Sequence, residues 1–301
     1  MRCPMKKFLT AAITAALILV ALAACTAPTS EVRVETVYLP HADGTYAYAE
    51  AVFPAGATDE LTPLVAMGHG FTGTLNSGGA EELAHRLAEA GIATIRVDFD
   101  PRVAADKKAE KTNFYSLTSM EADLSQGIDY MCENYKIDED RIGLYARSMG
   151  GRVAMRMANE SYGGRDYACM SLVAPAGNAG AMVYYMGGQE KWDAMKVTAA
   201  AFGYVEKQGQ KLTPEWFAEF EEYDPCEYGY KFGDKPVYVI YNTDDYVVTS
   251  STSIDCANAY SNSHTTEVTT DDGHGYEMGF KESEMKDMLM DSIVEFFKEN
   301  L

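Results

Sequence analysis

Short apolar runs alternate along most of the chain with segments in which apolar residues recur every three or four positions. The runs have the length of buried strands, and the periodic segments have the spacing of amphipathic helices. Strands are predicted over 64–68, 93–99, 142–146, 168–174, 237–241 and 265–270, and helices over 79–90, 119–134, 149–160, 252–260 and 282–298. A strand followed by a helix, repeated in this way, predicts βαβ units and a mostly parallel sheet.

Two segments upstream of this pattern behave differently. Residues 32–39 and 45–53 alternate between apolar and polar positions around a short His-Ala-Asp-Gly turn. A period of two is typical of a strand with one buried face, and the short turn predicts a hairpin. We expect this hairpin to form an antiparallel edge of the sheet.

A stretch of about 60 residues, 175–234, interrupts the alternation, and it is too long for a structureless connection. Its segments 191–207 and 213–223 have helical periodicity, which predicts a mainly helical cap inserted over the sheet. The cap is rich in aromatic residues, among them Trp192 and Trp216. Most of these are expected to form the cap's own core, and a minority to face a ligand.

The N-terminus has the form of an export signal. Three basic residues precede an apolar run over 8–24, which is the pattern of a secretory signal peptide. The run ends in Leu-Ala-Ala-Cys at Cys25, which resembles the lipobox of bacterial lipoproteins. The resemblance implies that 1–24 is a lipoprotein signal peptide, that Cys25 receives a lipid, and that a tether over 25–31 precedes one domain over 32–301. An ordinary cleaved signal and a plain apolar anchor are the alternatives.

Such a protein would be exported and held on the outer face of the bacterial cytoplasmic membrane or on the cell surface. The chain has 25 Lys and Arg against 45 Asp and Glu, a formal net charge of −20. Loss of the three basic residues in 1–24 would leave 22 − 45 = −23. A surface this acidic repels phosphate backbones, so nucleic acid is not expected as a partner. It also repels anionic lipids, so the lipid on Cys25 would have to provide the membrane attachment.

The sequence gives little indication of a metal site. Its six cysteines are scattered singly, and its five histidines form no pair at i, i+4, so no zinc framework is present. Asp244, Asp245, Asp271 and Asp272 lack the regular loop of a calcium site. We expect no metal and no cofactor, and we leave open whether Cys226 and Cys256 pair.

The strongest local motif is Ala-Arg-Ser-Met-Gly over 146–150, which lies between an apolar strand and a helix. A nucleophile elbow needs small residues two positions before and after its serine, because the turn from strand to helix is too sharp for larger ones. Ala146 and Gly150 fill these positions around Ser148. The motif predicts a nucleophilic serine, and the alternative is a serine that only caps the helix.

A nucleophilic serine needs a base and donors for the oxyanion. His69 and Gly70 lie in a glycine-rich loop directly after the first core strand, a place that suits an oxyanion loop. The N–H groups of Phe71 and Met149 would then face the tetrahedral oxygen, and His69 would shape the loop. His274 follows the last strand, where a loop can bring its imidazole beside the serine, so we expect His274 to be the base.

The acid that orients the base should lie between serine and histidine, after a strand. Asp245 follows the predicted strand over 237–241, and Asp244 is its immediate competitor. The order Ser148, Asp245, His274, with separations of 97 and 29 residues, is specific. We expect Asp245 to hold the imidazole in its productive tautomer.

With these motifs the chain resembles the α/β-hydrolase family over 32–301. The loop His-Gly-Phe-Thr-Gly, the serine elbow, Asn-Thr-Asp-Asp-Tyr-Val-Val over 242–248 and Gly-His at 273–274 are similar to the bacterial cinnamoyl (feruloyl) esterase-like branch. Two features depart from that branch, which has Gly-His-Ser at the elbow and often a Gly-His-Gly loop where this chain has Asp-Phe-Asp-Pro-Arg from 98 onward.

The resemblance implies an α/β-hydrolase fold with an inserted cap and an acyl-enzyme reaction on a small-molecule ester. We expect a carboxylic ester hydrolase for small or aromatic acyl groups, with the cap setting the substrate choice. A peptidase, a thioesterase or a lipase using the same triad is an alternative, and in the peptidase Glu215, Glu219 or Glu222 would bind a free amine. The second alternative is a protein without catalytic activity, namely a cell-surface binding lipoprotein on a hydrolase scaffold.

Overall fold

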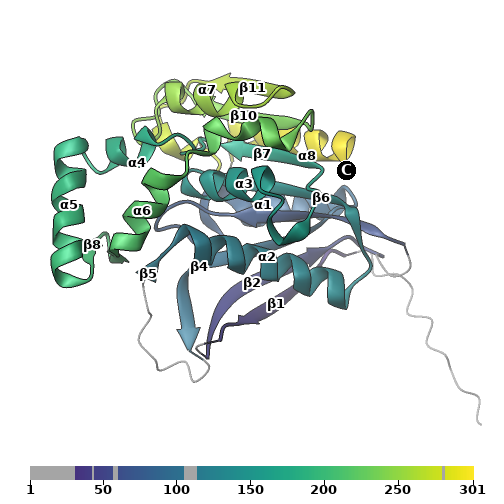
Figure 1. The fold of residues 1–301 in the computed structure, drawn as a ribbon. Helices are drawn as coiled ribbons and strands as arrows, with labels where there is room; N and C mark the ends of the chain where they lie inside the picture. Colours follow the sequence, from purple (N-terminus) through teal and green to yellow (C-terminus); the bar gives the residue numbers. More distant parts are fainter. Residues whose placement is uncertain (1–30, 43, 57–59, 105–113, 280–281) are drawn as a thin grey trace, which may run out of the picture.

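The computed structural model describes residues 31–42, 44–56, 60–104, 114–279 and 282–301 (Figure 1). The predicted signal peptide, Cys25 and nearly all of the tether lie outside these residues. Over the part of the chain that is described, no helix combines the length and the apolar composition needed to cross a membrane.

An eight-stranded sheet forms the centre of the molecule, in the order β1-β2-β4-β3-β6-β7-β10-β11. Its strands are β1 Arg33–Pro40, β2 Thr45–Phe53, β3 Thr62–Gly68, β4 Ala93–Ala104, β6 Ile137–Arg147, β7 Cys169–Val173, β10 Val237–Asn242 and β11 Ser263–Val268. From β4 to β11 every neighbouring pair is parallel, whereas β1 and β2 pair antiparallel and β2 joins β4 antiparallel. The predicted parallel sheet with an antiparallel hairpin edge is confirmed.

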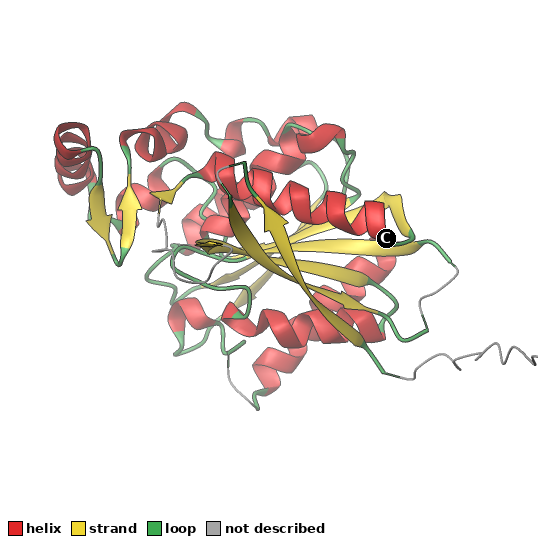
Figure 2. Ribbon diagram, turned by 90° about the horizontal axis from the view of Figure 1, so that it is seen from below, coloured by secondary structure: helices red, strands yellow, loops and turns green. Residues whose placement is uncertain are grey.

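Helices cover both faces of this sheet (Figure 2). They are α1 Ala80–Glu89, α2 Leu117–Asn134, α3 Met149–Asn159, α7 Ser250–Asn258 and α8 Glu284–Asn300. α1 and α8 contact each other and share one apolar core, while α2, α3 and α7 border the other. Because both faces are covered, β7 and β10 are buried at every position, which explains their continuous apolar runs.

Between β7 and β10 the chain forms a separate helical layer, seen at the left of Figure 1. It contains α4 Gly180–Tyr185, α5 Gln189–Phe202, α6 Pro214–Glu222 and the short strands β8 Val205–Lys207 and β9 Gln210–Leu212. β9 pairs with β8 and also with β5 Phe114–Tyr115, so a small three-stranded sheet ties this layer to the main domain. The sequence pattern predicts the helices but not this sheet.

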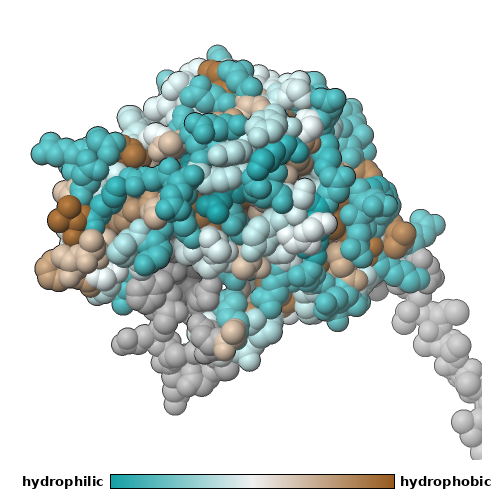
Figure 3. Space-filling view, in the orientation of Figure 1, coloured by the Kyte–Doolittle hydropathy of each residue, from teal (hydrophilic) through white to brown (hydrophobic). Residues whose placement is uncertain are grey.

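The cap's aromatic residues mostly pack against one another. Trp192 and Trp216 are 1% and 0% exposed, and their ring centroids lie 5.6 Å apart, with Phe217 and Phe220 around them. Val197 and Phe202 on α5 face outward instead, and Figure 3 shows apolar side chains at this outer edge of an otherwise largely hydrophilic face. The two tryptophans are therefore core residues of the cap.

Trp216→Ala should lower the free energy of unfolding by about 3–5 kcal/mol, because it leaves a large cavity in this aromatic core. Phe202→Ala is the matched control, since Phe202 is 78% exposed, and it should change stability by less than about 0.5 kcal/mol. Urea denaturation of both variants checks the prediction, and equal losses would contradict it.

The pair Cys226 and Cys256 lies where the cap returns to the main domain. Their Sγ atoms are 3.6 Å apart, and both thiols are free in this structure.

Candidate active site

Ser148 lies at a strained turn between β6 and α3. Its φ of 52° and ψ of −123° are unusual for a residue with a side chain, and strain of this kind is concentrated at functional sites. The turn needs small neighbours: a Cβ on Gly150 would lie 2.4 Å from the His69 carbonyl oxygen, and one on Gly70 would lie 2.9 Å from the Ser148 Cβ. These contacts explain why glycine stands two residues after the serine, at 150, and in the loop packed against the serine, at 70.

His274 lies in the short 3-10 turn Gly273–Gly275, after β11, and its Nδ1 is 2.7 Å from Asp245 Oδ2. The other oxygen of Asp245 accepts hydrogen bonds from the backbone N–H groups of Val247 and Val248, at 2.8 and 2.9 Å. Asp245 is buried, whereas Asp244 is exposed. Of the two neighbouring aspartates, the structure brings Asp245 to the histidine.

Tyr276 adds a fourth hydrogen bond to the acid, from its hydroxyl to Asp245 Oδ2 at 3.2 Å. Burial, and next the Asp245 charge, hold the pKa of Tyr276 well above its usual value, so the hydroxyl keeps its proton and donates. The tyrosine oxygen also accepts from the Asn242 N–H at 2.8 Å. The Asn242 side chain in turn donates to Gly273 O at 2.7 Å, which ties the end of β10 to the histidine loop.

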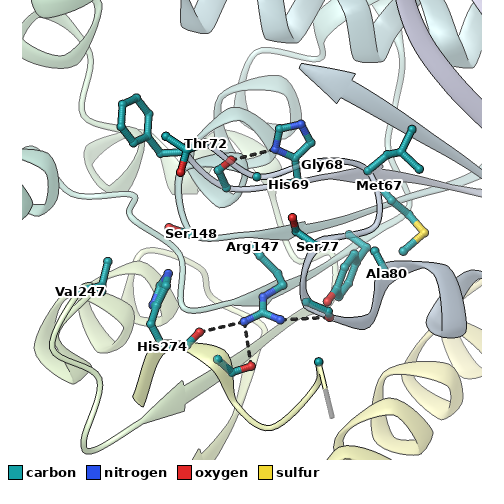
Figure 4. Close-up of a pocket in the computed structure, with 18 of the residues that line it drawn as sticks. Met67, Gly68, His69, Thr72, Ser77, Ala80, Arg147, Ser148, Val247 and His274 are labelled. Atoms are coloured by element: carbon teal, nitrogen blue, oxygen red, sulfur yellow. Dashed lines mark hydrogen bonds between the residues drawn. The ribbon is translucent and has the colours of Figure 1, made fainter. Parts of the chain in front are cut away.

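Ser148 and His274 line one cavity of about 700 Å³. Figure 4 shows the His274 ring directed toward Ser148. Within the described residues no hydrogen bond joins the Ser148 hydroxyl to the imidazole, and such bonds are often long until a substrate binds. The three predicted residues Ser148, Asp245 and His274 thus meet at one site.

The loop after β3 forms another wall of the cavity. The His69 Nε2 accepts from the Phe99 N–H at 2.9 Å, so the ring proton lies on Nδ1, which donates to Gly70 O at 2.8 Å. Asp98 Oδ1 is 3.2 Å from the same Nε2. Both ring nitrogens of His69 are therefore occupied in fixing the loop that carries Phe71. Met149 is the first residue of α3, and its N–H has no acceptor within the helix.

The lining of the cavity differs from the expectation for the cap. The lining comes from the loop over 68–73, the turn Ser77–Gly79, the end of β6, residues 246–247 and the loop that carries His274. No described residue of 175–234 contributes to it. Phe71 links the two regions, since its ring centroid is 6.1 Å from that of Tyr185 and 6.4 Å from that of Trp216.

The glutamates of α6 do not line the cavity either. Glu219 accepts from the Ser116 hydroxyl and from the Leu117 and Thr118 N–H groups, at 2.9, 2.7 and 3.2 Å, so it caps the start of α2. None of Glu215, Glu219 and Glu222 lines the cavity, whose charged residues within the described chain are Arg147 and Asp272. The Asp272 carboxylate accepts a hydrogen bond from the Glu277 N–H at 2.9 Å, and the sequence pattern predicts no role for it.

Among the described residues, no group of three or more His, Cys, Asp or Glu side chains is placed to hold a metal ion.

A family described as "Serine aminopeptidase, S33" matches residues 59–262. The chain belongs to this family. No curated protein matches it in sequence. Among solved structures it is similar to Est1E from Butyrivibrio proteoclasticus, with 20% identity, a TM-score of 0.65, and coverage of 88% of this chain and 98% of that one. A hypothetical protein from Pseudomonas aeruginosa shares 15% identity with a TM-score of 0.69, covering 91% of this chain and 95% of that one.

An esterase from Pyrococcus furiosus is similar at 17% identity and a TM-score of 0.58, over 89% of this chain and 91% of that one. These likenesses establish the α/β-hydrolase fold predicted from the motifs. Together with the family, they place the chain among the hydrolases.

Proposed function

We propose that this protein is a serine hydrolase that cleaves carboxylic esters of small or aromatic acyl groups. The observation that carries the proposal is the 2.7 Å hydrogen bond between Asp245 and His274, in a cavity that also contains Ser148 on its strained elbow. In a non-catalytic binding protein nothing would require this combination.

The reaction follows from the positions of the protons. Asp245 accepts a hydrogen bond from the Nδ1–H of His274, which keeps the ring proton on Nδ1 and leaves Nε2 free to take the proton of the Ser148 hydroxyl as its oxygen attacks the ester carbonyl. The Phe71 and Met149 N–H groups stabilise the tetrahedral oxyanion. His274 then gives its proton to the leaving alcohol, and an acyl-enzyme forms. Water repeats these steps, which releases the acid and restores Ser148.

The acyl preference is supported by the lining of the cavity. Met67, Leu75 and Ala80 provide apolar walls, and about 700 Å³ holds a small or ring-containing acid. Est1E has been solved with ferulic acid bound, at 19% identity to this chain. Since Trp192 and Trp216 are buried in the cap, the preference comes from the cavity walls and not from the tryptophans.

An aminopeptidase is the second candidate, favoured by the description of the family and by the Asp272 carboxylate in the cavity. A panel of p-nitrophenyl acetate, octanoate and cinnamate with an aminoacyl p-nitroanilide separates the two. We expect kcat/KM to be highest for the acetyl or cinnamoyl ester. Faster cleavage of the anilide, abolished by Asp272→Asn, would favour the peptidase, and an octanoyl ester preferred by more than about tenfold would contradict the compact or aromatic acyl site.

Attachment through a lipid on Cys25 is part of the proposal. Cys25→Ser should release the protein from membranes or leave it unprocessed, because the serine has no thiol for the lipid. Cys3→Ser is a matched control in the same leader and should leave fractionation unchanged. Mass spectrometry of the N-terminal peptide checks the result, and a wild-type peptide without lipid, with unchanged fractionation of Cys25→Ser, would refute the anchor.

A further inference from the structure

We propose that Arg147 is a positioning residue that fixes the His274 loop against the strand of the nucleophile. The inference rests on the proposed function, since it assigns His274 as the base. Arg147 stands directly before Ser148, where the esterase branch that the chain resembles has histidine.

The Arg147 guanidinium holds two loops at once. Its Nη2 donates to the carbonyl oxygens of His274 and Gly275 at 3.0 and 3.2 Å, and its Nη1 donates to Gly78 O at 3.0 Å (Figure 4). Because Arg147 directly precedes Ser148 in the chain, its side chain links the nucleophile's own strand to the backbone of His274. No other described side chain hydrogen-bonds to the His274 carbonyl.

The same side chain supports the acid of the triad. The Arg147 Cζ lies 5.7 Å from the ring centroid of Tyr276, the residue whose hydroxyl donates to Asp245. A planar cation is attracted by the face of an aromatic ring. Arg147 therefore contacts the backbone of the base directly and reaches the acid through one intermediate residue.

The chemistry of this contact requires arginine. Arg147 is only 9% exposed, and among the described residues no carboxylate lies within 4.0 Å of it, so backbone carbonyls stabilise its charge. A guanidinium offers a fixed fork of donors in one plane, whereas an ammonium is a single point with flexible bonds. Lysine can keep the charge but cannot reach Gly78 and His274 together.

Gly78 gives an independent way to disturb the fork without changing Arg147. A Cβ on Gly78 would lie 1.9 Å from Arg147 Nη1, and the residue has a φ of 64°. Gly164 has a similar φ of 74° and lies in another 3-10 turn, and a Cβ on Gly164 would have no heavy atom within 4 Å. Gly164→Ala thus has the same backbone strain without the contact.

The test compares Arg147→Met, Arg147→Lys, Gly78→Ala and Gly164→Ala with wild type, using the best p-nitrophenyl ester and thermal unfolding. We expect kcat to fall by about 10²-fold in Arg147→Met, with KM within a factor of about three, because misplacing a catalytic group by about 1 Å costs on this order. Arg147→Lys should lose nearly as much. The kcat of Gly78→Ala should also fall. The kcat of Gly164→Ala should stay at the wild-type value, although its melting temperature should match that of Gly78→Ala.

Several results would overturn the proposal. They are an Arg147→Met enzyme with wild-type kcat, a loss confined to KM, full activity in Arg147→Lys, and equal losses in Gly78→Ala and Gly164→Ala. Ser148→Ala, measured alongside, separates this failure from that of the proposed function. If Ser148→Ala retains the activity, the hydrolase mechanism itself is wrong, whereas an inactive Ser148→Ala with an active Arg147→Met refutes only the positioning role.

Discussion

Replacing Ser148 by alanine should lower kcat for ester hydrolysis by about 10⁴-fold or more, because the members of a cooperating triad lose their effect together when the nucleophile is removed. The melting temperature should change little, since the Ser148 hydroxyl makes no hydrogen bond within the described residues and the strained backbone of the elbow is retained. Steady-state kinetics and circular dichroism on the same preparation check both expectations.

Ser77→Ala is a matched control for this variant. Ser77 lines the same cavity, but its hydroxyl accepts a hydrogen bond from the Thr74 N–H at 2.8 Å, so its role is local to that turn. Its kcat should stay within about tenfold of wild type, far from the loss expected at the nucleophile. A fluorophosphonate probe should label Ser148, and labelling of another residue in the wild-type protein would refute the assignment.

The central sheet can be predicted from the sequence because burial on both faces gives β7 and β10 continuous apolar runs. Strand ends are less accessible to this reasoning. β6 begins at Ile137 rather than 142, since the polar segment Asp-Glu-Asp-Arg that follows Ile137 extends the strand without an apolar pattern. In the small sheet, β5 pairs with β9 about 100 positions away, and β8 and β9 form a hairpin of three-residue strands. Strands this short leave no local periodicity.

The candidate site, like the fold, has parts that the sequence predicts and parts that it does not. The elbow, the acid and the histidine each have a local signature, because each depends on a turn and the residues beside it. The role of Arg147 has none, since its acceptors are backbone carbonyls near residues 78 and 275 that only the tertiary fold brings together. The arginine in place of histidine at the elbow is the one feature of the sequence that marks this position for attention. The aromatic density of the cap predicts a core with a minority of residues facing a ligand, but it does not say which residues those are. Trp192 and Trp216 belong to the core.

Asp245→Asn should lower kcat/KM by about 10⁴-fold, because an amide in place of the carboxylate reverses the hydrogen bond to the base. The oxygen of the new side chain would stay with the Val247 and Val248 N–H groups, so its NH₂ would face His274 Nδ1. The imidazole proton would then move to Nε2, the atom that must accept the Ser148 proton, and the base would be in the wrong tautomer.

Asp244→Asn is the matched control for the acid, one residue away in the same loop. Asp244 is exposed and its backbone N–H donates to Asn242 Oδ1 at 3.1 Å, a bond that the substitution keeps, so its kcat/KM should remain close to wild type. Because Asp245 is buried and its carboxylate accepts four hydrogen bonds, its replacement should also reduce stability, whereas Asp244→Asn should not. Kinetics at one pH and thermal unfolding of both variants decide the ranking. A larger loss in Asp244→Asn would mean that the loop after β10 is displaced by one residue in the working enzyme and that Asp244 is the acid.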